Sequence, residues 1–522
     1  MTPSPPARAW KPLLETLAGA PEAAWLERGR ALQREGDVAA AMAVFAEAAI
    51  RFPDSGDARL GMAGLCWQSG QRAQAEAVLR AWLDGHPGHA AATFLLVQCL
   101  REEGRLQAAA DAMHRLFGHG PHDADTVIQA VEMLDDYGRQ ADAAAICEQA
   151  IAAGAEDPRL HAYAGMLALQ LGQFERVRER YAYALARNGQ AVEWNIPLGL
   201  ASLQRYRDPR HPDLAFFHEV LQRPGLSERT RTATMFALGK AHDDLEDFRQ
   251  AADWLRQANA RAHAGSTWSR KRWRRSIEAL LAAPPRAPAL PPSEGWAPLF
   301  VVGVPRSGTT LLAERLSRYP GVRNRGELGW LQVLAQRLSL APPGQRAPFE
   351  AAAAQYAAQL RQDDADGRWF IDKQPLNLLH VGLILALWPN ARIIHCERHA
   401  RDTALSLWFQ SFHDPAHDYA YDLGEIATVI QDCRRLAAHW RQRHPDAFRT
   451  IHYEALVGSP EDELGKLAHW LGLPEADAAD APAGSIGTAS VWQARQPVYT
   501  RSVGRWRHYA AYLPELLKIP DA

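Results

Sequence analysis

Five glycines recur through the first third of the chain at a constant interval of 34 residues. They are Gly36, Gly70, Gly104, Gly138 and Gly172. Prolines recur in phase with them at Pro53, Pro87 and Pro121, and alanine dominates the sequence up to about residue 260. Glycine permits a tight turn between two helices, and proline ends the second helix of a pair. The interval therefore predicts a stack of helical hairpins.

The first repeat is the most complete. It contains Trp25, Gly29, Leu32, Gly36, Ala41, Phe45, Ala48 and Pro53. This pattern with this period resembles the tetratricopeptide repeat. A further match, out of phase with the others, carries Leu238, Gly239, Ala251 and Ala258, whereas residues 189–230 indicate a loop or a degenerate repeat. We expect an all-α tetratricopeptide solenoid over residues 1–282.

Two roles are open for such a solenoid. Its concave face can hold a peptide or protein partner. Alternatively, its helices can serve in oligomerisation or pack rigidly against the second half of the chain. No sequence feature indicates what the groove holds, so both roles are retained.

A change of composition separates the two halves. Five prolines lie between residues 283 and 297, and this density opposes helix and sheet alike. We expect a stiff linker over 283–297 and a second domain over 298–522. The apolar run Leu299–Val302 then predicts a buried parallel strand, followed by a turn over 303–310 and a helix from Leu311.

A strand, a glycine-rich turn and a helix form the geometry that binds phosphate groups. The N–H groups of the turn and of the helix N-terminus carry partial positive charge. Arg306 adds a full charge, and hydroxyl groups are added by Ser307, Thr309 and Thr310. The loop is not a Walker A motif, because Thr309 follows Gly308 where that motif requires lysine. An ATP-driven reaction is thereby disfavoured.

Further strands end in charged residues. Residues 369–371 predict a strand that leads to Asp372 and Lys373, and residues 391–396 predict one that leads to Arg398. Another strand is expected to end at residues 452–454. Arg398 and Ser406 can converge on a second anion, while Arg401 and Asp402 are expected to form a local salt bridge. The sequence predicts a P-loop-like α/β domain with a parallel sheet, and a nucleotide-like ligand with two separated phosphates.

With these residues assembled, the domain resembles the sulfotransferases that use 3′-phosphoadenosine 5′-phosphosulfate (PAPS). It is most similar to the tyrosylprotein-sulfotransferase-like branch, and to bacterial proteins that fuse tetratricopeptide repeats to such a domain. The resemblance covers residues 298 to about 515. It implies that Arg306, Ser307, Gly308, Thr309 and Thr310 hold the 5′-phosphosulfate. It also implies that Arg398 and Ser406 grip the 3′-phosphate.

The same resemblance implies further roles. Glu327 resembles the catalytic base of the tyrosylprotein branch, and Lys373 resembles the lysine that protonates or stabilises the bridging oxygen. The residues that lie around the adenosine and its phosphates in the family resemble three residues of this chain, Tyr453, Ser490 and Arg505. No metal is implied. Two departures affect the expected tyrosine specificity more than PAPS binding: His399-Ala400 replaces the usual Asn-Pro or Asp-Pro, and Leu-Gly-Trp follows Glu327.

Composition limits the other function classes. The 522 residues contain 58 Lys+Arg and 60 Asp+Glu, so the net charge of -2 gives no global basis for binding nucleic acid or a membrane surface. The five cysteines are far apart, which disfavours a disulfide framework or a zinc site. No signal peptide is recognisable and no run of about 18 apolar residues occurs, so a cytoplasmic protein is expected.

Three hypotheses follow. The leading one is a cytoplasmic sulfotransferase that moves a sulfuryl group from PAPS to a hydroxyl or amine of a peptide, protein or small molecule. The second is a tetratricopeptide adaptor with a non-catalytic nucleotide-binding domain, which would not need Glu327 and Lys373. The third is an ATP-dependent kinase, against which the missing P-loop lysine counts.

Overall fold

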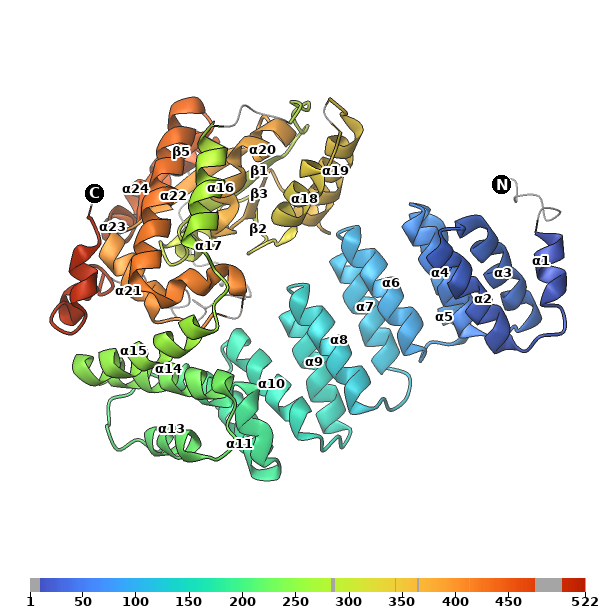
Figure 1. Cartoon of the computed structure of the whole chain (residues 1–522), viewed down its shortest axis with the longest axis horizontal. Coiled ribbons are helices and arrows are strands. Elements are labelled where there is room, and N and C mark those ends of the chain that lie inside the picture. Colours follow the sequence, from blue (N-terminus) through green and yellow to red (C-terminus); the bar gives the residue numbers. More distant parts are fainter. Residues whose placement is uncertain are drawn as a thin grey trace. The chain divides into compact units, whose positions relative to one another are not determined.

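The chain forms two compact units, Met1–Ala155 and Glu156–Ala522. The computed structural model describes residues 10–282, 287–342, 344–363, 366–412, 414–474 and 500–521. The first unit is entirely helical in its described part, and the second joins further helices to a parallel sheet (Figure 1).

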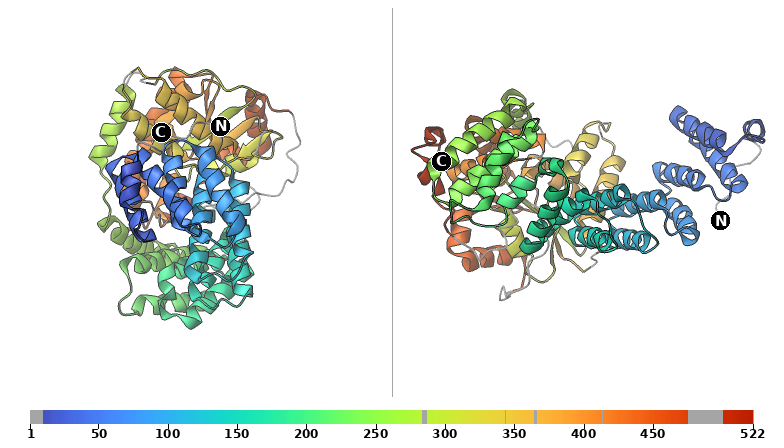
Figure 2. Two further views of the ribbon diagram at one scale, coloured as in Figure 1. Left: turned by 90° about the vertical axis from the view of Figure 1, so that its right-hand side faces the viewer. Right: turned by 90° about the horizontal axis from the view of Figure 1, so that it is seen from below.

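The first unit consists of successive helical hairpins, as Figures 1 and 2 show. Its helices are α1 Lys11–Thr16, α2 Glu22–Glu35, α3 Val38–Arg51, α4 Gly56–Gln68, α5 Arg72–Gly85, α6 Ala90–Glu102, α7 Leu106–Phe117, α8 Ala124–Asp136 and α9 Gln140–Ala152. Each repeating glycine follows the first helix of its pair, either directly or after one intervening residue. Their φ angles are 82° at Gly36, 75° at Gly70, 74° at Gly104 and 75° at Gly138, all left-handed. The predicted helical solenoid is therefore confirmed.

Small residues set the distance between neighbouring helices. Phe45 of α3 is buried against two glycines, Gly29 of α2 and Gly61 of α4. A Cβ atom at Gly29 would lie 2.6 Å from the ring of Phe45, and one at Gly61 would lie 2.7 Å from it. Because real Cβ atoms do not come that close, only glycine lets α2 and α4 both pack on this ring.

The left-handed turns give a matched pair of substitutions. Gly70→Ala should lower the free energy of unfolding by roughly 1 kcal/mol, because alanine at φ 75° meets its own backbone although nothing else lies within 4 Å. Gly64→Ala, in the interior of α4, should instead raise it by roughly 0.5 to 1 kcal/mol. Urea unfolding followed by circular dichroism measures both. Equal effects of the two substitutions would contradict the assigned role of the turn.

The second unit begins with more helices. They are α10 Pro158–Leu171, α11 Phe174–Arg187, η1 Gly189–Trp194, α12 Ile196–Ala201, α13 Pro212–Gln222, α14 Glu228–Asp244, α15 Phe248–Ala264 and α16 Arg270–Ala282. Helices α10 and α11 form the hairpin around Gly172, whose φ is 76°. The out-of-phase match forms the pair α14 and α15, in which a Cβ at Gly239 would lie 2.7 Å from Leu255. Between these two pairs, residues 189–230 were expected to form a loop or a degenerate repeat, but most of them are helical, in η1, α12, α13 and the start of α14, and the longest loop covers residues 202–211.

A five-stranded, fully parallel sheet follows in the order β2-β3-β1-β4-β5. The strands are β1 Ala297–Gly303, β2 Val322–Asn324, β3 Trp369–Asp372, β4 Arg392–Glu397 and β5 Phe448–His452. Strand β2 was not anticipated from the sequence, because three residues carry too little pattern. The remaining helices are α17 Thr309–Leu316, α18 Trp330–Ser339, α19 Ala347–Arg361, η2 Pro375–His380, α20 Val381–Leu387, α21 Ala400–Trp408, η3 Pro415–Tyr421, α22 Leu423–Arg443, α23 Tyr453–Gly458, α24 Pro460–Leu471, η4 Arg505–Tyr509 and η5 Pro514–Lys518.

Each face of the sheet is covered by helices. On one face, Leu312 of α17 and Leu467 of α24 share an apolar core with Val301 of β1. The core on the other face contains Phe300 of β1 together with Phe236 of α14. The predicted parallel α/β architecture is thus confirmed, and the helix pair α14 and α15 contributes to its core.

The described part of the proline-rich stretch lies against the α/β domain. The amide of Leu290 donates to the carbonyl of Ala386 at 2.8 Å. The side chain of Asn390 donates to the carbonyls of Ser293 and Trp296, both at 3.0 Å. The boundaries expected at residues 282 and 297 stay a prediction. Among helices within the described ranges, none has both the length and the apolar character needed to cross a bilayer.

Candidate functional site

The predicted site residues follow the carboxyl ends of the five parallel strands. Arg306 lies in the loop after β1, Glu327 follows β2, and Lys373 directly follows β3. Arg398 directly follows β4, and Tyr453 directly follows β5. Because the strands are parallel, these five positions lie at one edge of the sheet, where open α/β folds bind their ligands.

The loop between β1 and α17 is held in an unusual backbone conformation. Arg306 has a φ of 72° and Gly308 a φ of 102°. A Cβ atom at Gly308 would lie 2.5 Å from the ring of Tyr453, so that ring covers the loop directly. A left-handed arginine is strained and persists only where its surroundings fix it, which is common at functional sites.

The two predicted anion-binding signatures meet. The Nε atom of Arg306 donates to the hydroxyl of Ser406 at 3.1 Å, and Arg398 Nη1 donates to the carbonyl of Arg306 at 3.1 Å. The guanidinium of Arg398 also lies 4.6 Å from the centre of the Tyr453 ring. The structure therefore brings Arg306, Arg398, Ser406 and Tyr453 together at the loop.

Two buried donors in this cluster are unsatisfied. The Ser307 hydroxyl and the Arg398 Nε atom are buried, and neither has a hydrogen-bond partner among the described residues. Buried polar groups without a partner are costly and usually belong to a site that a ligand completes. A cationic and a hydroxyl donor at one helix start suit an oxyanion.

Glu327 and Lys373 form an ion pair at the same edge. The lysine side chain is 2% exposed, whereas the glutamate is 40% exposed. The backbone N–H of Lys373 donates to the carbonyl of Gly326 at 2.7 Å, which ties the end of β3 to the segment that carries Glu327. A buried cation thus faces a carboxylate that solvent can reach.

Asp372 supports this pair, and the sequence did not single it out. Its carboxylate is fully buried and accepts from the Leu328 amide at 3.2 Å, the Gln374 amide at 3.0 Å and Asn377 Nδ2 at 2.7 Å. The hydroxyl of Tyr356 also donates to it. Burial raises the pKa of Asp372 to about 6. The only sequence signal for Asp372 was its place at the end of a strand, next to Lys373.

The shifted pKa of Asp372 predicts a pH dependence of stability. The folded-state pKa lies above the unfolded value of about 3.9, so folding favours the protonated form. The stabilisation of the fold by protonated Asp372 is complete below about pH 4 and is lost as the pH rises through about 6. The wild-type free energy of unfolding, minus that of Asp372→Asn, should therefore fall by roughly 2 to 3 kcal/mol between pH 4 and pH 7. Urea unfolding at four pH values measures the difference, and a flat difference would refute the assignment.

The segment after residue 500 completes the cluster. Ser502 accepts from Arg398 Nη2 through its carbonyl at 2.7 Å, and its hydroxyl bonds the hydroxyl of Tyr453 at 2.7 Å. The carboxylate of Asp402 accepts from the amides of Gly504 at 2.6 Å and Trp506 at 2.9 Å. A cavity of about 350 Å³ is lined by Arg398, Asp402, Gly504 and Trp506, among others.

For this region, the expected salt bridge between Arg401 and Asp402 is wrong, whereas the roles expected for Arg505 and Ser490 stay predictions. Arg401 pairs with Asp521 at 3.1 Å, whereas Asp402 holds backbone amides instead of forming the expected local salt bridge. Arg505 forms an ion pair with Asp243 of α14 at 2.6 Å, and its expected place near the adenosine and its phosphates stays a prediction. Ser490 lies outside the described residues.

Other chemistry finds little support in the described residues. His395 is 3% exposed, and burial lowers its pKa to about 3, so it is a neutral core residue. Within the described ranges, no group of three or more His, Cys, Asp or Glu side chains is arranged to hold a metal ion.

Comparison with known families gives two matches. Residues 298–477 match the model of the sulfotransferase family, and residues 32–92 match the model of the tetratricopeptide repeat. The first match contains the loop after β1, Glu327, Lys373 and Arg398.

Individual relatives span different parts of the chain. An uncharacterized protein of Aquifex aeolicus is 26% identical over 95% of this chain and 69% of its own length. A protein-tyrosine sulfotransferase of Drosophila melanogaster is 26% identical over 34% of this chain, which spans only 39% of that protein. The solved sulfotransferase domain of the Synechococcus PCC 7002 olefin synthase is 20% identical over 44% of this chain and 95% of its own, with a TM-score of 0.31. Residues 298–477 are thus similar to the sulfotransferase family, and residues 32–92 are similar to the tetratricopeptide repeat.

Proposed function

We propose that the domain transfers a sulfuryl group from PAPS to a hydroxyl or an amine of a peptide, a protein or a small molecule. The observation that carries the proposal is the common edge of the sheet. The Glu327–Lys373 ion pair and the cluster of Arg306, Arg398 and Ser406 follow the carboxyl ends of neighbouring strands there. An acid–base pair beside two anion-binding arginines suits group transfer from a phosphorylated nucleotide.

The chain's own groups suit the two ends of PAPS. In this proposal the loop residues 306–310 hold the 5′ end, and Arg398 with Ser406 holds the 3′-phosphate. The unsatisfied Ser307 hydroxyl and Arg398 Nε fit this role, because each would gain an oxyanion partner. PAPS supplies an activated sulfuryl group when bound.

The transfer requires one proton acceptor and one cation. A bond forms between sulfur and the acceptor oxygen or nitrogen, and the bond between sulfur and the 5′-phosphate oxygen breaks. Glu327 takes the proton of the acceptor, for which its exposed carboxylate is suitably placed. Lys373 offsets the negative charge left on the phosphate, and its burial strengthens this electrostatic effect.

The repeats suggest a protein-directed role. We propose that their concave face holds a peptide or protein partner, since repeat solenoids commonly present such surfaces. The Drosophila relative is named for protein-tyrosine sulfation, so tyrosine peptides belong in an acceptor screen beside small phenols and amines.

Binding of the product nucleotide tests the proposed nucleotide site. We expect 3′,5′-ADP to bind more tightly than ATP or 5′-AMP in calorimetry, and Arg398→Ala to weaken it at least tenfold, about 1.4 kcal/mol. The matched control is Arg449→Ala, because Arg449 of β5 lies 4.8 Å from the Trp470 ring and contacts none of the clustered residues in the described structure. If 3′,5′-ADP does not bind the wild type, the adaptor function is favoured instead.

Transfer assays with labelled PAPS test the catalytic pair. Glu327→Gln and Lys373→Ala should each lower the transfer rate by about 10²- to 10⁴-fold, the usual contribution of a proton-transferring or charge-stabilising group. The affinity for 3′,5′-ADP should change little in Glu327→Gln. The control is Glu350→Gln, because Glu350 lies on α19 and forms an exposed ion pair with Arg346. Full activity of both site variants would refute the mechanism.

A further inference from the structure

One C-terminal segment, residues 502–509, is held at two places. At one end it contacts the proposed nucleotide site. Arg398 donates to the Ser502 carbonyl at 2.7 Å, and Asp402 accepts the Gly504 and Trp506 amides at 2.6 and 2.9 Å. Arg398 and Asp402 therefore depend on where this segment lies.

The other end of the segment is held by a helix of the repeat series. Asp243, at the end of α14, accepts from Arg505 Nη2 at 2.6 Å and from the Tyr509 hydroxyl at 2.5 Å. The Asp243 side chain is 17% exposed and that of Arg505 26% exposed, so this ion pair is mostly withdrawn from water. Such a pair is costly to break on one side only.

Aromatic contacts fix the same end. Phe248 of α15 stacks on His508 at 4.8 Å and lies edge-on to Tyr509 at 5.3 Å. Phe409, just after α21, lies edge-on to Tyr509 at 5.5 Å, and the Arg505 guanidinium lies 4.4 Å from the Phe409 ring. Tyr509 is fully buried between these two parts of the unit.

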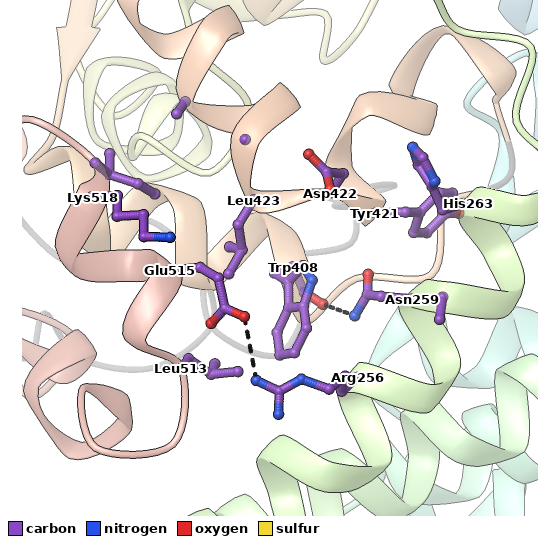
Figure 3. Close-up of a pocket in the computed structure, with 14 residues that line it drawn as sticks. Arg256, Asn259, His263, Trp408, Tyr421, Asp422, Leu423, Leu513, Glu515 and Lys518 are labelled. Atoms are coloured by element: carbon purple, nitrogen blue, oxygen red, sulfur yellow. Dashed lines mark hydrogen bonds and ion pairs between the residues drawn. The ribbon is translucent and has the colours of Figure 1, made fainter.

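Helix α15 extends this attachment (Figure 3). Asn259 Nδ2 donates to the Trp408 carbonyl at 2.9 Å, and Arg256 pairs with Glu515 at 3.6 Å. Arg256 also donates to the Tyr512 carbonyl at 3.1 Å. Arg256, Asn259, Trp408 and Glu515 line a cavity of about 590 Å³ between α15 and the chain end around η5, so the helix pair is bonded to both α21 and the chain end.

We propose that Asp243 of α14 is a positioning residue for the nucleotide site. The proposal rests on the proposed function, because it assigns Arg398 to the nucleotide. Asp243 compensates the charge of Arg505, and Arg505 lies between Gly504 and Trp506, the residues whose amides Asp402 holds. Without Asp243, the Arg505 guanidinium has lost its charged partner and is more stable in solvent. The segment then moves with Arg505 and loses its fixed position against Arg398 and Asp402.

The test compares Asp243→Asn with Glu228→Gln. Glu228 also lies on α14 and pairs with Arg261 of α15 at 2.7 Å, but it is 71% exposed and that ion pair does not involve the segment. We expect Asp243→Asn to bind 3′,5′-ADP about tenfold more weakly, the scale of one lost charged partner. The KM for PAPS should rise by a similar factor while kcat changes less than about threefold, because the catalytic pair is untouched. Glu228→Gln should match the wild type.

Hydrogen exchange of the Gly504 and Trp506 amides gives a readout that needs no nucleotide. Both should exchange at least about tenfold faster in Asp243→Asn, while the core of β1 keeps its protection. Unchanged exchange and affinity would overturn the inference and leave the proposed function standing. A wild type that does not bind 3′,5′-ADP would overturn the proposed function, and exchange alone would then decide whether Asp243 positions the segment.

A conservative variant covers the case in which Asp243→Asn does not fold. Asp243→Glu keeps the charge and moves the carboxylate by one methylene, so Arg505 retains a partner. We expect its affinity for 3′,5′-ADP to lie between those of the wild type and Asp243→Asn. A folded Asp243→Glu whose affinity for 3′,5′-ADP falls while the Gly504 and Trp506 amides exchange as in the wild type would refute the positioning role, because the segment would then not have moved.

Discussion

Parallel pairing of β1 with both β3 and β4 is the constraint on which the site depends. It places Gly303 beside Cys396 and Phe300 beside Asp372, so the loops that follow these strands leave the sheet at one edge. Side chains 100 residues apart in the sequence, such as Arg306 and Ser406, can then bond directly. Since the strands are buried on both faces, their register is fixed by packing rather than by any ligand.

Charge compensation then gives the edge its fixed geometry. Lys373 is buried against Glu327, Asp402 is buried against two backbone amides, and Arg398 is held by two carbonyls. Groups arranged in this way need little reorganisation when charge develops, which is the main electrostatic advantage of an active site. The unsatisfied Ser307 hydroxyl and Arg398 Nε atom are the exceptions, and both suit the oxyanion that the site is proposed to bind.

Local signals made much of this predictable from the sequence. Left-handed turns favour glycine, so the 34-residue spacing predicted the hairpins, and the glycine-rich segment 303–310 predicted the turn between β1 and α17. Long-range pairs were not predictable. Asp243 and Arg505 lie on separate helices 262 positions apart, and nothing local to either residue marks the other. Asp372 was missed for the same reason, because its importance comes from partners such as Tyr356.

The shared core shows how a repeat can become part of an α/β domain. Phe236 of α14 and Leu255 of α15 are buried in the same apolar core as Phe300 and Trp388. A generic hairpin of the solenoid buries its apolar face against its neighbours in the stack. Helices α14 and α15 also bury apolar side chains against the sheet domain, and Asp243 of α14 holds the C-terminal segment through Arg505. Their sequence must therefore suit two packing partners. The match at Gly239 lies outside the 34-residue phase, and its helix α14 packs both on the preceding helices, through Leu238, and on the sheet domain, through Phe236.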